Sequence, residues 1–266
     1  MTTGTRPSRA SNSGVEIAYE VVGSGPPLVL VQGLGYGGGR GWGPALDLLA
    51  EDFLIVSYDN RGFGASDAPA GPYTVAQLAG DAAAVLDAAG LERASVLGVS
   101  LGGMAAQELA LTRPDRVDRL VLVSTTPGFR GHPMPARTVS LMLEAAQLDP
   151  AVALRRFVEN ALGSGDGEEL TEQIVAYRTA HPPDPDGWKA QAAAGATHDA
   201  IERLAAIAAP TLVLHGAEDA VVDPRNGELL AESIPGARLE LFRGAGHLLS
   251  WEEPERFAEL VRRFLL

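Results

Sequence analysis

The sequence predicts an α/β fold, in which a mostly parallel, doubly wound sheet carries an inserted helical lid. Two observations lead to this prediction. Short, strongly apolar runs alternate with segments of helical character along most of the chain, as a sheet covered by helices requires. From about residue 126 to 206 the alternation stops, and only helical runs separated by proline and glycine clusters remain.

The expected strands are short, and several are rich in β-branched residues, which is typical of strands buried on both faces of a sheet. The first alternates apolar and other residues from Val15 to Val21 and ends at a glycine- and proline-rich stretch. The other strands are expected at 28–31, 53–58, 94–99, 120–123, 211–214 and 239–242.

Helices are expected between these strands, at 42–50, 74–89, 101–112, 225–233 and 254–264. Gly90 and Pro114 follow the second and third of them and are ordinary helix stop signals. The chain should therefore divide into a core formed by residues 1–125 and 207–266 and a helical lid formed by 126–206.

Composition excludes several classes of function. The chain has 266 residues, 46% of them hydrophobic, and a net charge of −13, so it offers no basic stripe for nucleic acid. It has no cysteine, which rules out disulfides and thiolate–metal sites. No apolar run reaches the roughly 18 residues of a membrane span, and residues 1–14 lack the apolar core of a signal peptide. We expect a soluble, cytoplasmic protein; its oligomeric state is left open.

One motif carries chemistry. Gly98-Val99-Ser100-Leu101-Gly102 is the only G-x-S-x-G match, and it joins an expected strand to an expected helix. Such a turn exposes the serine hydroxyl and leaves no room for side chains two positions away on either side. Ser100 is therefore the candidate nucleophile, with Gly98 and Gly102 as the glycines that permit the turn.

A serine hydroxyl needs a base and a group that orients the base. Asp219 and His247 each follow a later strand, in the chain order serine, acid, histidine, so both should open on the edge that carries Ser100. Glu218 and Asp223 flank Asp219 as other acids, and Asp223 before Pro224 fits a helix cap. Two further predictions concern histidines: His215 is expected to support the site, whereas His132, His181 and His198 are expected on the surface.

Acyl transfer also needs donors for a developing oxyanion. The strand at 28–31 runs into Gln32-Gly33-Leu34-Gly35, which places the Leu34 amide near the serine turn. The Leu101 amide lies at a helix N-terminus, which favours an anion. Leu34 and Leu101 are therefore the predicted oxyanion hole. The candidates for the substrate pocket are Gly33, Gly35, Trp42, Trp188 and Leu248; for the two tryptophans ordinary packing is the favoured interpretation.

These motifs resemble the α/β-hydrolase fold family, and in particular its lidded serine hydrolases: carboxylesterases, enol-lactonases of the 3-oxoadipate type and cofactor-free haloperoxidases. The resemblance covers Val15 to Leu266 and includes the turn from Asp59 to Ser66. Many members have His-Gly where this chain has Gln32-Gly33. The resemblance implies no metal or organic cofactor, and a small or medium carboxylic ester or lactone as the substrate, cleaved through an acyl-enzyme.

Other functions remain open. A C–C bond hydrolase, an acyltransferase or a haloperoxidase/perhydrolase could use the same three residues, and a non-catalytic ligand receptor could keep the fold. Gly33 to Gly38 also fits G-x-G-x-x-G, with Asp59 lying 21 residues beyond Gly38, as in dinucleotide-binding proteins. A strand precedes the motif strand, and the next helix begins too late to receive a pyrophosphate, so this reading is disfavoured.

Overall fold

The computed structural model describes residues 7–165 and 167–266, and it contains one eight-stranded sheet of order β1-β2-β4-β3-β5-β6-β7-β8. The strands are β1 (Ser8–Asn12), β2 (Val15–Val22), β3 (Pro27–Val31), β4 (Leu54–Tyr58), β5 (Ala94–Val99), β6 (Val117–Val123), β7 (Thr211–Gly216) and β8 (Arg238–Phe242). Neighbouring strands are parallel from β4 to β8, and only β1–β2 and β2–β4 are antiparallel. The predicted fold class is confirmed.

Strand β1 was not expected from the sequence. It pairs with β2 at the edge of the sheet, from Ser8 opposite Tyr19 to Asn12 opposite Val15. Only Ala10 of this strand is buried, so the strand carries almost none of the apolar alternation by which a strand is recognised. Strand β6 also begins three residues earlier than expected, at Val117, because the polar Asp118 and Arg119 interrupt its apolar run.

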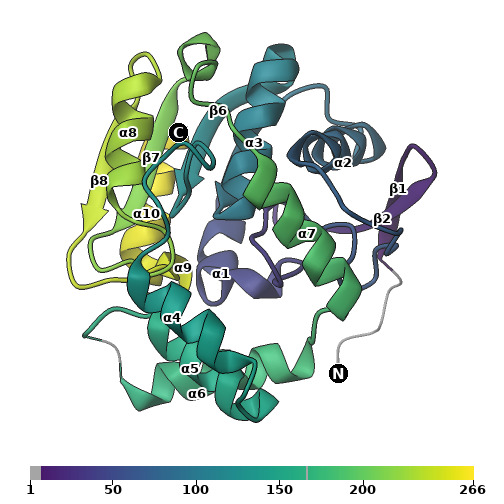
Figure 1. Cartoon of the computed structure of the whole chain (residues 1–266). Coiled ribbons are helices and arrows are strands. Elements are labelled where there is room, and N and C mark those ends of the chain that lie inside the picture. The colour runs from purple at the N-terminus through teal and green to yellow at the C-terminus, as the bar shows by residue number, and fades with distance from the viewer. Residues whose placement is uncertain (1–6, 166) are drawn as a thin grey trace.

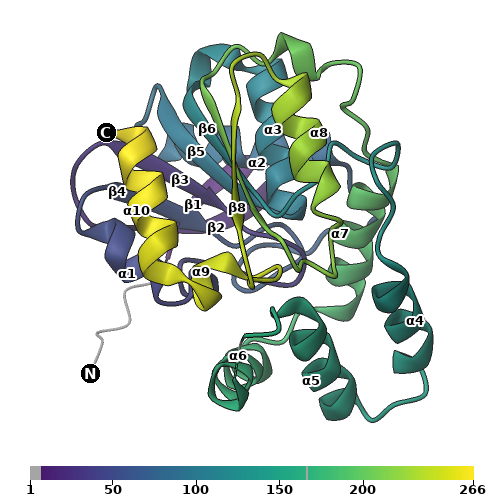
Figure 2. The same cartoon turned by 90° about the vertical axis from the view of Figure 1, so that its left-hand side faces the viewer.

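Helices cover both faces of the sheet (Figure 1). Helices α1 (Ala45–Ala50), α9 (Leu249–Glu252) and α10 (Pro254–Leu265) lie on one side in Figure 2, and α2 (Val75–Ala88), α3 (Leu101–Thr112) and α8 (Arg225–Ser233) lie on the other. Short 3₁₀ turns occur at η1 (Arg40–Trp42), η2 (Pro114–Arg116) and η3 (Leu204–Ala206). None of the helices among the described residues is both long and apolar enough to cross a membrane.

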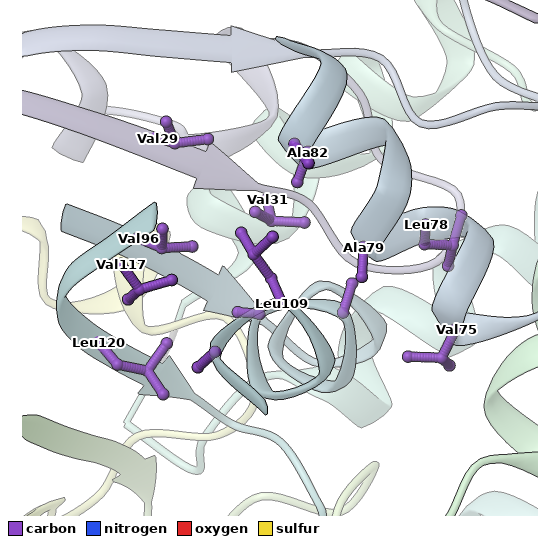
Figure 3. Packing of buried hydrophobic residues seen from close by; sticks show 14 of the residues in the cluster. Val29, Val31, Val75, Leu78, Ala79, Ala82, Val96, Leu109, Val117 and Leu120 are labelled. Atoms are coloured by element: carbon purple, nitrogen blue, oxygen red, sulfur yellow. The ribbon is translucent and has the colours of Figure 1, made fainter. Parts of the chain in front are cut away.

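The central strands contribute side chains to two separate hydrophobic cores, because alternate side chains point to opposite faces of the sheet. In β3, Val29 and Val31 pack toward α2 and α3, whereas Leu28 and Leu30 pack toward α1 and α10. Figure 3 shows the first of these cores, with Leu109 of α3 and the inner face of α2 against the strand valines. A strand buried on both faces forms a rigid support for the loops at its end.

Four helices occupy the chain between β6 and β7, where the helical insertion is predicted: α4 (Ala136–Ala145), α5 (Pro150–Ala161), α6 (Glu168–Ala180) and α7 (Pro185–Thr197). Figure 2 shows α5 and α6 standing apart from the sheet, while α7 runs beside the core. The α7 backbone meets the core directly, because a Cβ on Gly187 would lie 2.2 Å from the Gly62 carbonyl oxygen. The last helix of the insertion therefore packs against the loop after β4 without a side chain between the two backbones.

Candidate active site

Ser100 sits on a strained turn between β5 and α3. Its φ of 53° and ψ of −120° lie in a region that residues with a side chain rarely adopt. A Cβ on Gly98 would lie 2.3 Å from the Gly102 carbonyl oxygen, and one on Gly102 would lie 2.1 Å from the Val31 carbonyl oxygen. Both positions therefore require glycine, as the sequence motif predicts.

The turn lies where the winding of the sheet reverses. From β3 the chain goes to β4 on one side and then returns to β5 on the other, so the loops after β3 and β5 diverge and leave a crevice between them. Gly33, which follows β3, lies against the serine: a Cβ added there would be 3.2 Å from the Ser100 Cβ and 3.8 Å from its Oγ. A side chain at Gly33 would therefore pack tightly against the Ser100 Cβ.

The loop after β3 is fixed by the residue that departs from the common His-Gly pattern. The Gln32 Oε1 accepts a hydrogen bond of 3.0 Å from the Gly33 amide, and Asn60 Nδ2 donates to the Gln32 carbonyl oxygen at 2.9 Å. The Gln32 side chain already accepts from the Gly33 N–H. The Leu34 N–H is therefore the next amide along this loop that could donate to an oxyanion. Leu101 begins α3, and a first helical residue has no intrahelical acceptor for its N–H.

The predicted acid and base are in contact. His247 Nδ1 and Asp219 Oδ2 are 2.7 Å apart, and Asp219 is fully buried. The Asp219 Oδ1 accepts from the amides of Val221 and Val222 at 2.8 and 2.9 Å. A carboxylate can only accept, so His247 Nδ1 donates this bond and its Nε2 is left as the basic nitrogen.

His215 contributes a second imidazole to the same carboxylate. Its Nε2 lies 3.2 Å from Asp219 Oδ2 and 3.2 Å from the Val222 carbonyl oxygen, and its side chain is fully buried. Burial by itself raises the pKa of Asp219, but the charge of His247 and the hydrogen bonds from His215 and His247 outweigh burial, so the pKa of Asp219 is lowered well below its ordinary value. His215 thus supports the site, as expected.

The helical insertion supplies neighbours to the loop after β3. A Cβ on Gly35 would lie 3.1 Å from Trp188 Cδ1 and 3.3 Å from Arg178 Nη2, so α7 and α6 both reach this loop. The Arg178 guanidinium stacks over the Tyr36 ring at 4.7 Å. Sequence reasoning proposed Trp188 but not Arg178, which stands among ordinary helix residues and carries no local signal.

Trp42 and Leu248, two other candidates for the substrate pocket, both pack within apolar clusters. Trp42 is 1% exposed and packs into the core beneath α1 and α10, which is the packing interpretation favoured for it from sequence. Leu248 packs with Val158, Leu162 and Ile174 of the insertion. Leu248 is therefore a contact between the histidine loop and the insertion.

The other acids and histidines considered from the sequence lie in different surroundings. Asp223 accepts from the backbone amide of Arg225, the first residue of α8, which fits the predicted capping role. Glu218 is exposed and accepts from Ser164 in the insertion. The expectation that His198 lies on the surface is wrong: it is 7% exposed, and burial lowers its pKa because it disfavours the charged imidazole.

The chain belongs to the alpha/beta hydrolase fold family, whose pattern matches residues 26–254, and it is a hydrolase. It is 32% identical to RutD of Azorhizobium caulinodans, provisionally named a carbamate hydrolase, over 96% of this chain and 97% of that protein.

Solved structures agree with this assignment. The enol-lactonase of Burkholderia xenovorans LB400 is 30% identical with a TM-score of 0.84, covering 97% of this chain and 99% of that one. The esterase RhEst1 of Rhodococcus sp. ECU1013 is 32% identical with a TM-score of 0.86, covering 98% of each chain.

Proposed function

We propose that this hydrolase cleaves a small or medium carboxylic ester or lactone through an acyl-enzyme formed on Ser100. The observation that carries the proposal is the 2.7 Å hydrogen bond between His247 Nδ1 and the buried Asp219 carboxylate. That bond fixes the imidazole tautomer whose Nε2 can accept a proton. Relatives named as an esterase and an enol-lactonase support the substrate class.

The reaction has two halves. In the first, His247 Nε2 takes the proton from Ser100 Oγ while Oγ bonds to the substrate carbonyl carbon, and the amides of Leu34 and Leu101 donate to the resulting oxyanion. Collapse of this intermediate expels the alkoxide, which takes the proton from His247. A water molecule, deprotonated by His247, then attacks the acyl-enzyme, and the carboxylic acid leaves Ser100 with its proton restored.

Asp219 remains ionised throughout these steps. Its lowered pKa keeps the carboxylate charged beside the imidazolium that forms in each half of the reaction. The buried Asp219 carboxylate would stabilise that positive charge more strongly than a water-exposed carboxylate could, because its surroundings are of low dielectric. No proton passes to Asp219.

The decisive experiment is intact-mass analysis after treatment with a fluorophosphonate, which phosphonylates an activated serine. We expect one adduct on the wild-type protein and none on Ser100→Ala. Absence of the adduct on folded wild-type protein would refute the acyl-enzyme route. Steady-state assays with matched p-nitrophenyl esters, lactones and carbamates then decide the substrate class; a preference for carbamates would overturn the ester or lactone proposal while keeping the nucleophile.

A further inference from the structure

One carboxylate binds the backbone on both sides of His247. In α9, Glu252 Oε2 accepts from the Gly246 amide at 2.7 Å, and its Oε1 accepts from the Leu248 amide at 2.8 Å. Hydrogen bonds to a carboxylate are roughly twice as strong as neutral ones. The two oxygens of a single side chain therefore hold the residue before and the residue after His247.

The same carboxylate reaches the helical insertion. Glu252 Oε2 also accepts from the Gly163 amide at 2.9 Å, just beyond the end of α5. The His247 amide in turn donates to the Ala161 carbonyl oxygen at 2.6 Å. The histidine loop and the end of α5 are thus joined by one direct backbone bond and by the Glu252 carboxylate, which binds amides of both segments.

These two segments touch without any side chain between them. A Cβ on Gly163 would lie 1.9 Å from the Gly244 carbonyl oxygen, and one on Gly246 would lie 2.4 Å from the Ala161 carbonyl oxygen. Such close contact of two backbones is possible only while the segments keep this arrangement. A displacement of the end of α5 would therefore carry the His247 backbone with it.

The histidine loop has particular need of such support. It contains two glycines, Gly244 and Gly246, and Gly244 has a φ of 83°, so the free loop could adopt many conformations. The bond to Asp219 fixes the imidazole ring but not the backbone that carries it. A catalytic group must be held within about 0.5 Å of its working position.

We propose that Glu252 is a positioning residue for the base: it holds the His247 backbone and ties it to the end of α5, so that the imidazole is in place only while that part of the insertion is docked. The proposal rests on the function proposed above for His247. The Glu252 bonds described above come from backbone amides, so its proposed role is to act through the backbone of His247.

Glu252→Gln tests this directly. The amide offers one acceptor oxygen in place of two and turns an N–H group toward backbone donors, so at least one of the three bonds is lost. We expect kcat to fall by roughly 10- to 10²-fold, with KM changed by less than about twofold, because the substitution displaces the base and leaves the pocket candidates Gly33, Gly35 and Trp188 unchanged. Hydrogen–deuterium exchange should accelerate at the amides of Gly163, Gly246 and Leu248 and stay unchanged in the central strands.

Two matched substitutions serve as controls. Glu255→Gln and Glu259→Gln each remove a carboxylate from an exposed position of α10, three and seven residues along the chain from Glu252. Both should keep wild-type kcat and wild-type exchange at Gly246 and Leu248. If either reproduced the defect of Glu252→Gln, loss of negative charge near this helix would explain it and the clamp would be refuted.

A second variant covers a folding failure. Glu252→Asp keeps the charge but is shorter by one methylene and cannot reach both sides of His247, so we expect lowered kcat with KM retained. Wild-type kcat and wild-type exchange in this variant would overturn the proposal. The exchange measurement also separates the two proposals, because it reports on the clamp even if Ser100→Ala were to keep full activity.

Discussion

One oxygen of the Asp219 carboxylate contacts two imidazole rings, with His247 Nδ1 at 2.7 Å and His215 Nε2 at 3.2 Å. Its other oxygen accepts hydrogen bonds from the backbone amides of Val221 and Val222. Every lone-pair direction of the buried carboxylate is therefore occupied, which holds it as an ion and fixes its orientation. Replacing Asp219 should change the chemistry at His247 more than it changes the fold.

Asp219→Asn should lower kcat by roughly 10³- to 10⁴-fold, because an amide that donates toward Nδ1 favours the tautomer with its proton on the wrong nitrogen. The measurement is steady-state hydrolysis of the best ester found by screening. Asp223→Asn is the matched control, since that carboxylate binds Arg225, whereas the carboxylate of Asp219 contacts the imidazole. Near wild-type activity in Asp219→Asn with loss in Asp223→Asn would reassign the acid.

The lowered pKa of Asp219 predicts a pH dependence of stability. A carboxylate whose pKa falls on folding stabilises the folded state above its unfolded pKa of about 3.9, and that stabilisation is lost as pH falls toward the folded pKa. The difference in free energy of unfolding between wild type and Asp219→Asn should therefore be largest near pH 6 and shrink below about pH 4. Urea unfolding at several pH values measures it, and a difference independent of pH would contradict the assigned shift.

Gly102→Ala should destabilise the protein, because the added methyl group would lie 2.1 Å from the Val31 carbonyl oxygen and 2.5 Å from that of Gln32. Overpacking of this kind costs about 1–3 kcal/mol. Thermal and urea unfolding give the change. Gly165→Ala is the control, since a Cβ there meets no atom of the described residues within 4 Å; equal stabilities for the two variants would show that the elbow can relax.

Gln32→Ala should lower kcat with little change in KM. The substitution removes the acceptor of the Gly33 amide and so loosens the loop that carries the Leu34 N–H. A displaced oxyanion donor can cost up to about 10²-fold in rate. Kinetics of Gln173→Ala, an exposed glutamine of α6, provide the comparison. If Gln32→Ala were as active as that control, the glutamine would have no part in holding the oxyanion loop.

The sequence by itself determined the class of fold and the three candidate catalytic residues. Strands such as β5 and β7 are continuous apolar runs because both their faces are buried, and helices such as α3 and α8 begin and end where local signals place them. The serine turn is equally local: its glycines are dictated by atoms within a few residues and by the neighbouring strand. Chain order then supplied the acid and the histidine.

Only the tertiary structure decided which groups meet. Edge strand β1 is held by pairing with β2, and its own residues are too polar to predict a strand from the sequence. The place of His215 at a strand end suggested a supporting role but not its contact with Asp219, and Glu252 is an ordinary residue in the sequence. Both gain their contacts from the way separate loops fold together. Such contacts depend on long-range packing, for which the periodicity of apolar residues carries no information. Local rules thus place the nucleophile, and packing sets its surroundings.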